Sequence, residues 1–348
     1  MMNPDEYGAR LFGFMGAGSA ALCIAMAKDT GILEALLEAE VPMTSQEIAE
    51  KKGLKERYVR EVLGGLATAG VIQVNEDSSH YHVPTCHKGV LRSTSAYSRM
   101  LPLFGQRYPA VKECFKLDGP PGVAFGALPE VFDIMEDYRS ANQDMFIDNN
   151  ILSAVPGLKE RLETGITVAE FGSASGTLLT NMAARFPKSS FTGSDVVESV
   201  VEAANAAAST RNLRNVTFKT YDLFNLPSEL NNSFDWIFIS DVAHDLAYLD
   251  KALSGIRRAV KSRGIFSMLD LCMSGKVAEN VGNMGACFLF TGSTMLCLAE
   301  SSLYENSDQI GPSWTVEKAR DYLIRAGFNI VKVHHAAKDK HMTHFVCE

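Results

Sequence analysis

Val168-Ala169-Glu170-Phe171-Gly172-Ser173-Ala174-Ser175-Gly176 is the stretch that decides the fold of this chain. Two small apolar residues and an acid lead into a glycine-rich turn. Asp195 follows nineteen residues after Gly176, at the end of a second apolar run. A strand, a tight turn, a helix and a second strand that ends in a carboxylate form half of a nucleoside-binding α/β domain.

The composition of the turn indicates which nucleoside it binds. A dinucleotide fingerprint has glycine at three positions of the turn, whereas this chain has Gly172, Ala174 and Thr177 there. Glu170 directly precedes the turn, where a carboxylate would repel a pyrophosphate. An acidic entry suits a cationic ligand, and S-adenosyl-L-methionine is a nucleoside that carries an ammonium and a sulfonium. We therefore predict a methyl-donor site, with plain strand–turn–helix packing as the alternative.

Side chains at the ends of the predicted strands complete this cofactor site. Asp195 is placed to accept the ribose hydroxyls. Asp222 can accept the adenine amino group while Leu223 packs on the ring face. The residues expected to bind the cofactor are Glu170, Gly172, Ser173, Gly176, Asp195, Val196, Asp222, Leu223 and Ser240.

Size, charge and cysteine content bound the possible classes of function. The chain has 348 residues, enough for two domains, and a net charge of −8 from 33 basic and 41 acidic residues. This charge does not favour a nucleic acid or an acidic membrane as a partner. Seven cysteines without a Cys-x-x-Cys pair argue against a disulfide framework, so we expect a reduced, cytoplasmic compartment.

The amino-terminal third is expected to form a separate helical domain. Residues 20–92 show three helical patterns and then two short strands, which is the order of a winged helix. For the apolar segment 11–27, a buried helix shared between two subunits is favoured over a membrane anchor. We place this domain at 1–115 and the nucleoside-binding domain at 116–348. Helices within 129–165 are expected to form a lid or substrate wall, or simply to cover the edge of the sheet.

A winged helix raises transcriptional regulation as a second class of function. Residues 55–69 would then form the helix that reads DNA. Residues 44–61 contain five basic and four acidic residues, and Glu76 and Asp77 occupy the wing. A net charge of only +1 on residues 44–61 does not favour DNA, so regulation is kept only as the alternative.

Strands and helices alternate from residue 167 onward, which predicts a doubly wound, mostly parallel α/β sheet. The stretch between the last two strands is too short for a crossover helix, so these strands are expected to pair antiparallel. The seven expected strands are 168–171, 191–195, 216–221, 236–240, 264–271, 330–333 and 344–347.

Polar residues follow strand after strand at the carboxyl edge of the predicted sheet, where doubly wound sheets bind their ligands. His244-Asp245 follows the fourth strand, and Asp270 ends the fifth. A methyl acceptor must lose a proton, and an imidazole with a pKa of about 6.5 is suited to take it. The alternative for His244 is a structural histidine bonded to backbone, and for Asp270 an exposed carboxylate at the end of a strand.

The whole chain resembles the small-molecule methyltransferases that carry an N-terminal winged-helix dimerisation domain, among them plant caffeic acid O-methyltransferase and hydroxyindole O-methyltransferase. The matching residues are 170–176, 193–195, 221–224, 244–246 and 325–328. The resemblance implies a seven-stranded class I methyltransferase sheet, S-adenosyl-L-methionine as cofactor, a small-molecule acceptor, a homodimer and a winged helix that does not bind DNA. It also implies His244 as general base and Asp270 as the acid that orients it.

The chain departs from the plant pattern at Ala174, Ser240 and Ser313. They replace a glycine of the turn, a lysine near the cofactor and a carboxylate near the base. Without that carboxylate, the acceptor atom stays open among a hydroxyl, a thiol and an amine. A methyltransferase fold that has lost activity and serves as a binding partner is a further alternative.

Four histidines lie near the carboxyl terminus and are candidate metal ligands. His334, His335, His341 and His344 lack cysteines or carboxylates at a supporting spacing. We therefore expect no metal site.

Overall fold

The computed structural model describes residues 2–124, 129–273, 276–335 and 342–348. The chain divides into one unit of Met1–Arg107 with Pro129–Asn142 and a second of Tyr108–Leu128 with Gln143–Glu348. The helix α7 (Pro129–Phe146), which opens the expected lid region, begins in the first unit and ends in the second.

The first unit is a winged helix preceded by a long apolar helix. Thr44 starts α3 through a capping box, because Glu47 N–H donates to Thr44 Oγ1 at 3.1 Å and Thr44 N–H donates to Glu47 Oε2 at 2.7 Å. A two-residue strand that the sequence did not reveal joins the expected hairpin in a sheet of order β1-β3-β2. The elements are α1 (Pro4–Asp29), α2 (Ile32–Glu38), β1 (Met43–Thr44), α3 (Ser45–Lys52), α4 (Glu56–Thr68), β2 (Gln73–Val74) and β3 (His80–His82).

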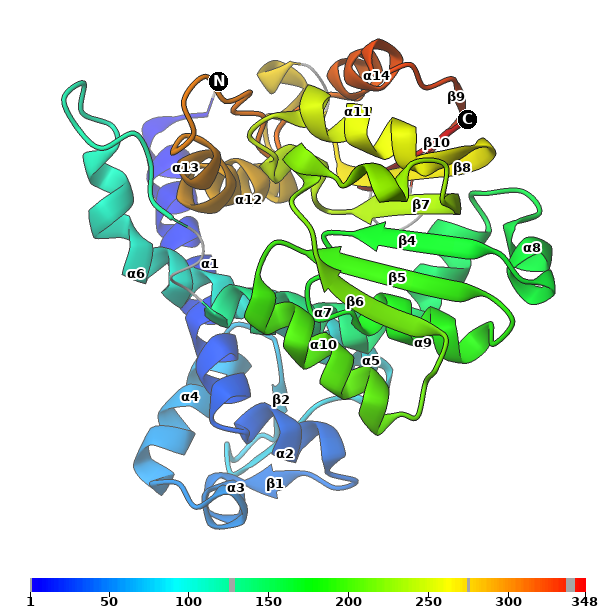
Figure 1. Cartoon of the computed structure of the whole chain (residues 1–348). Helices are drawn as coiled ribbons and strands as arrows, with labels where there is room; N and C mark the ends of the chain where they lie inside the picture. The colour runs from blue at the N-terminus through cyan, green and yellow to red at the C-terminus, as the bar shows by residue number, and fades with distance from the viewer. Residues whose placement is uncertain (1, 125–128, 274–275, 336–341) are drawn as a thin grey trace. The chain divides into compact units, whose positions relative to one another are not determined.

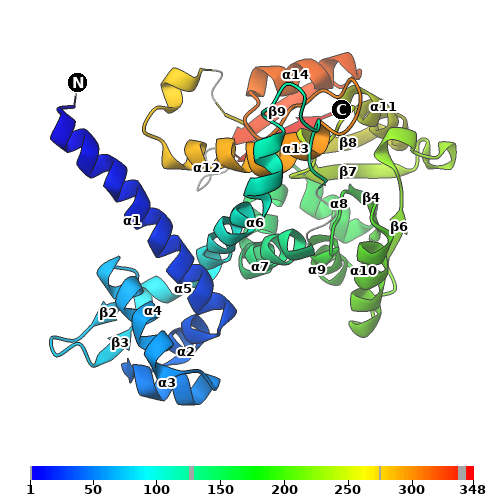
Figure 2. The same cartoon turned by 90° about the vertical axis from the view of Figure 1, so that its left-hand side faces the viewer.

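The helix α1 is apolar but exposed over most of its length. From residue 4 to residue 17 every side chain is exposed, and Phe12 and Met15 are 79% and 70% exposed. In Figure 2 its amino-terminal half extends beyond α2, α3 and α4. A helix that is apolar on all sides needs a covering surface, which the isolated chain does not supply within its described residues.

Two helical stretches, Pro4–Asp29 and Met284–Ser301, are long and apolar enough to cross a membrane if length and composition alone are considered. In their most apolar windows 11% and 33% of the residues are buried, respectively. The core helices of many water-soluble proteins share these properties, so they are weak evidence for a span.

The connecting region after the wing is more helical than its sequence pattern indicated. Residues 93–128 contain several glycines and prolines, yet helix continues through most of this region to residue 113. Pro109 lies inside α6, in a stretch whose Gly and Pro content favours turns over helix. The elements here are α5 (Thr85–Thr94), a 3₁₀ turn (Ser95–Arg99) and α6 (Met100–Glu113).

The second unit contains the predicted doubly wound sheet. Seven strands have the order β6-β5-β4-β7-β8-β10-β9, with β10 antiparallel to both β8 and β9 and the other pairs parallel (Figure 1). The fold class and the antiparallel final pair are confirmed. The strands are β4 (Thr167–Phe171), β5 (Ser190–Asp195), β6 (Val216–Thr220), β7 (Phe234–Ser240), β8 (Val260–Leu271), β9 (Ile330–His335) and β10 (Met342–Cys347).

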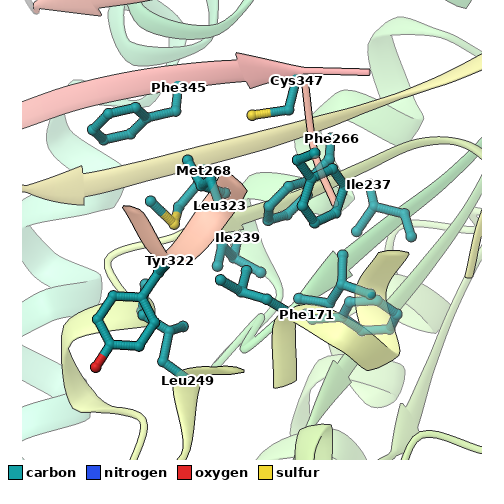
Figure 3. Close-up of a cluster of buried hydrophobic side chains, with 14 of the residues drawn as sticks. Phe171, Ile237, Ile239, Leu249, Phe266, Met268, Tyr322, Leu323, Phe345 and Cys347 are labelled. Atoms are coloured by element: carbon teal, nitrogen blue, oxygen red, sulfur yellow. The ribbon is translucent and has the colours of Figure 1, made fainter. Parts of the chain in front are cut away.

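Alternating strand residues pack on the two faces of this sheet. Phe171, Ile237 and Phe266 contact one apolar cluster together with Leu249 of α11 and Leu323 of α14, as Figure 3 shows. Val168, Trp236, Phe238 and Ile265 of the same strands pack on the opposite face against α8, α9 and α10. Because the central strands are buried on both faces, their carboxyl ends are held at one edge of the sheet. The helices are α8 (Leu158–Thr164), α9 (Thr177–Arg185), α10 (Glu198–Thr210), α11 (Leu249–Ala259) and α14 (Val316–Arg325).

An insertion follows β8 and leads back to the carboxyl edge of the sheet. It contains α12 (Met284–Gly292), a π-helix (Ser293–Cys297) and α13 (Leu298–Ser301). Val123 N–H donates to Ala299 O at 2.9 Å, so residues 120–124 run beside α13.

Candidate active site

The glycine-rich turn after β4 is bonded to the end of β5. Gly172 N–H and Ser173 N–H both donate to Ser194 O at 2.8 Å. Ala174 N–H donates to one oxygen of Asp195 and Val197 N–H to the other, each at 3.1 Å. The Asp195 carboxylate is therefore held beside the turn, with lone pairs left over for a ligand.

Gly172, Ala174 and Gly176 of the turn all have left-handed backbone, and the last two differ in what this costs. Gly176 has φ +72° at the start of α9, and a Cβ there would lie 2.4 Å from the Phe218 ring, so only glycine fits. Ala174 has φ +45°, which is strained for a residue with a side chain. The sequence departure at Ala174 thus places a methyl group where glycine is the unstrained residue.

The other predicted cofactor residues lie in unlike environments. Glu170, Ser173 and Ser240 are buried at the ends of β4 and β7, with 3%, 4% and 7% exposure. Val196 is 67% exposed. Leu223 is half-buried against the sheet core.

Asp222 is exposed and closes a turn of its own chain. It accepts hydrogen bonds from Phe224 N–H at 2.8 Å and from Asn225 Nδ2 at 2.6 Å. A nucleoside amino group would have to share these oxygens with the turn.

The structure brings the turn, the His244 segment and the segment around Ser313 together. A Cβ on Gly172 would lie 2.5 Å from a Val242 methyl, so the turn packs directly on the approach to His244. Gly311 N–H donates to His244 O at 3.0 Å, which places the stretch leading to Ser313 beside the same loop.

His244 is a buried imidazole between two carboxylates. It is 4% exposed and lies in the short 3₁₀ turn Ala243–Asp245. Nδ1 lies 2.6 Å from Asp270 Oδ1, and His244 N–H donates to Asp270 Oδ2 at 3.3 Å. Nε2 lies 3.3 Å from Asp245 Oδ1. Asp270 thus binds Nδ1 and leaves Nε2 as the ring nitrogen that can face a methyl acceptor, as a proton-accepting base requires.

Charge around the ring controls its proton affinity. Burial lowers the pKa of His244, but the carboxylates of Asp245 and Asp270 outweigh burial and hold that pKa well above its ordinary value. Burial also raises the pKa of the Asp245 carboxyl. The ring is therefore protonated more readily than an exposed histidine.

Cys297 and Asp245 belong to this site, although no role was assigned to either from the sequence. Cys297 ends the π-helix Ser293–Cys297, and its sulfur approaches the side chains of His244 and Asp245. Burial raises the pKa of the thiol to about 12. π-helices are often found at functional sites, but no sequence signal marks one here.

Two family models match the chain. A methyltransferase domain matches residues 162–289, which contain the turn, Asp195, His244 and Asp270. An Rv2258c-like winged HTH domain matches residues 18–92. The chain therefore contains a methyltransferase domain with a winged-helix domain in front of it. The methyltransferase resemblance is confirmed. No curated protein matches the chain by sequence.

Solved methyltransferases share the fold of this methyltransferase-domain protein over nearly its whole length. The mitomycin 7-O-methyltransferase MmcR is 16% identical, covers 98% of both chains and has a TM-score of 0.72. Human N-acetylserotonin methyltransferase, solved in complex with SAM, is 15% identical over 100% of this chain and 99% of its own, with a TM-score of 0.70. CalO1, a calicheamicin-biosynthesis methyltransferase solved with SAH bound, is 16% identical with the same coverage and TM-score.

Two of the carboxyl-terminal histidines contact different partners. His344 is buried in β10, and Nδ1 lies 2.9 Å from Asn150 O. His335 Nδ1 lies 3.2 Å from Thr343 Oγ1. His341 lies outside the described residues. Within the described part of the chain, the donors close enough to share a metal ion are instead those of His244, Asp245 and Cys297.

Proposed function

We propose that the protein transfers a methyl group from S-adenosyl-L-methionine to a small molecule, with His244 as general base. The observation that carries the proposal is the Asp195 carboxylate, fixed by the turn at 3.1 Å and left with lone pairs at the carboxyl edge. The turn beside it has no bulky side chain, and the buried Glu170 precedes it. These groups fit a cationic nucleoside better than a phosphate-bearing one.

The residues divide the work of the reaction between binding and proton transfer. Bound S-adenosyl-L-methionine would supply a methyl group activated by its sulfonium. Asp195 would hold the ribose hydroxyls, and Asp222 and Leu223 would adjoin the adenine. His244 Nε2 would take the acceptor proton while Asp270 holds Nδ1. We infer a hydroxyl acceptor, because a buried base is most useful where the acceptor must lose its proton before attack; thiols and amines are the other classes to assay.

Binding of S-adenosylhomocysteine tests the cofactor assignment. Isothermal titration is expected to give a single site in the wild type. Asp195→Asn is expected to weaken it roughly 10–100-fold, because hydrogen bonds to a charged group are lost. Asp250→Asn is the matched control. Asp250 lies on α11 and forms an ion pair with Arg325 at 3.2 Å. A wild-type protein that does not bind the compound would remove the assignment.

Turnover of His244→Ala tests the base assignment. The variant is expected to lose roughly 10²–10⁴-fold in kcat with nearly unchanged cofactor affinity. Unchanged turnover would show that the acceptor arrives already deprotonated and that His244 is structural.

We propose that the protein is a cytoplasmic homodimer in which a second copy covers α1. The exposed apolar surface of α1 needs a cover, and the seven cysteines are free thiols, as in a reducing compartment. A hollow of about 430 Å³ on the same unit is lined by small residues of α1 and α4, including Gly16, Ala20 and Gly65. Such a hollow can receive a side chain from a neighbour.

We infer that the winged helix does not read DNA. On α4, Arg60 Nε lies 3.2 Å from Glu56, and Arg57 forms an ion pair with Glu61. Arginines paired on their own helix contribute little to phosphate binding. A gel-shift assay at low salt is expected to show no retained duplex; salt-dependent retention would favour the regulator instead.

A further inference from the structure

Three donor atoms of different chemistry meet beside the His244–Asp270 pair. A ring nitrogen of His244, a carboxylate oxygen of Asp245 and the sulfur of Cys297 all lie within 4.8 Å of one another. Asp270 holds Nδ1 at 2.6 Å, which leaves Nε2 as the nitrogen available to a ligand. The donors come from two segments, the turn after β7 and the π-helix after β8.

This donor set matches the requirements of a zinc-class ion. Nitrogen, thiolate sulfur and carboxylate oxygen are the three ligand types of Zn²⁺, and tetrahedral bonds of about 2.0–2.3 Å place ligand atoms roughly 3.3–3.7 Å apart. Nε2 and Asp245 Oδ1 are already separated by 3.3 Å. To bring all three donor atoms to these separations, the side chains would have to move by on the order of 1 Å.

Two further observations point to a ligand at this position. A histidine that binds metal usually donates its second ring N–H to a carboxylate, and Asp270 occupies that place. Asp245 Oδ1 is a buried oxygen that forms no regular hydrogen bond with the described residues and has the ring Nε2 at 3.3 Å as an ion-pair partner. A cation bound between these atoms would replace the ring proton as the partner of this oxygen.

We propose that His244 Nε2, Asp245 and Cys297 form a binding site for one divalent cation of the zinc class. Three protein ligands leave a fourth position open to water or to the acceptor. Binding releases the Cys297 thiol proton, and any proton on Nε2, to solvent. The two ligand charges, thiolate and carboxylate, balance the ion.

The consequence of binding is inhibition of methyl transfer. A ring nitrogen bonded to a cation cannot accept a proton, so the base is unavailable while the site is filled. This consequence rests on the proposed function, whereas the binding itself does not.

Titration with Co²⁺ tests the site directly, without any assay of activity. We expect one equivalent of Co²⁺ to produce the thiolate-to-metal charge-transfer band of a cobalt–cysteine bond. Cys297→Ser is expected to abolish the band. Cys287→Ser, at an exposed cysteine of the same helical insertion, is the matched control and is expected to keep it. A band that survives Cys297→Ser, or its absence from the wild type, would overturn the site.

Calorimetry with Zn²⁺ alone identifies the remaining ligands. Asp245→Asn is expected to weaken Zn²⁺ binding at least tenfold, and Asp270→Asn to weaken it 10–100-fold through the lost orientation of the ring. Circular dichroism confirms that each variant is folded. Equal Zn²⁺ affinity in wild type and Asp245→Asn would overturn the assignment of that ligand.

A final measurement separates this inference from the proposed function. Zn²⁺ is expected to suppress turnover of the wild type while Cys297→Ser is at least tenfold less sensitive, with S-adenosylhomocysteine affinity unchanged by the metal. Co²⁺ binding without S-adenosylhomocysteine binding would refute the proposed function and leave the cation site standing. S-adenosylhomocysteine binding without a Co²⁺ band would refute the cation site and leave the proposed function standing.

Discussion

At the scale of single residues, the two carboxylates around His244 determine the pH at which a proton can be taken. Only the neutral imidazole accepts a proton, so turnover should rise with pH until it passes the raised pKa of His244. The profile of kcat/KM against pH is therefore expected to have its rising limb well above the ordinary histidine value of about 6.5.

Asp245→Asn tests this electrostatic balance. After burial, which opposes it, the Asp245 charge is the largest influence on the ring, and it raises the pKa. Its removal should lower the His244 pKa and move the rising limb of kcat/KM to lower pH. Asp250→Asn, remote on α11, should leave the profile in place. A limb that stays fixed in Asp245→Asn would show that another group titrates.

Ala174 provides a stability prediction for the turn. Because its φ is +45°, Ala174→Gly relieves strain and is expected to raise the free energy of unfolding by roughly 0.5–1 kcal/mol. Ala206→Gly, on the exposed side of α10, should lower it by about 1 kcal/mol. Urea titration of both variants measures whether the free energy of unfolding rises or falls in each. A loss of stability in Ala174→Gly would contradict the assigned backbone strain.

Much of the site was predictable at this scale, and the remainder has a physical reason. Glu170, Asp195 and Asp270 stand at strand ends, where local patterns of apolar residues predict both the strand and its last residue. Cys297 could not be assigned because its approach to His244 depends on the path of an insertion and on a π-helix. Neither the path of an insertion nor a π-helix produces a periodic pattern in the sequence.

At the scale of elements, the strand β10 carries a buried titratable group into the sheet. Burial lowers the pKa of His344 to about 4, although Asn150 O accepts from the ring. The unfolded chain binds a proton at about 6.5, so between these values the unfolded state takes up more protons than the folded state. Stability should then fall as pH falls from about 6.5 to 4, by about 3 kcal/mol in total.

His344→Gln is expected to remove this part of the acid sensitivity. The wild type and the variant should show parallel stability above pH 7 and diverge below about 6.5, as measured by urea unfolding at a series of pH values. The same slope in both proteins would mean that His344 is protonated in the folded state.

Elements differed in how far their sequences predicted them. The strands of the second unit have apolar, β-branched runs bounded by turns, and the ends of the observed strands differ from the predicted ends by no more than four residues. The two-residue strand Met43–Thr44 is too short to show any alternation. The helix α6 was missed because its Gly and Pro residues favour turns locally, while tertiary packing keeps them helical.

At the scale of the whole molecule, the uncovered helix α1 predicts association. The double variant Phe12→Asp/Met15→Glu places charges on its exposed apolar surface and is expected to convert a dimer into a folded monomer, measured by size-exclusion chromatography with light scattering. Tyr58→Ser removes a 73% exposed aromatic from α4 and serves as the control, which should remain dimeric. A monomeric wild type would refute the shared-helix interpretation.

The order of strands in the sheet bears on how the protein is made. β10 is the last strand of the sheet to be synthesised, yet it lies between β8 and β9. During synthesis β9 has no neighbour in the sheet until β10 has left the ribosome. Until then the nascent chain presents the open edge of β8. A chain truncated before β10 would therefore leave the edge of β8 exposed, and an open edge of this kind invites aggregation.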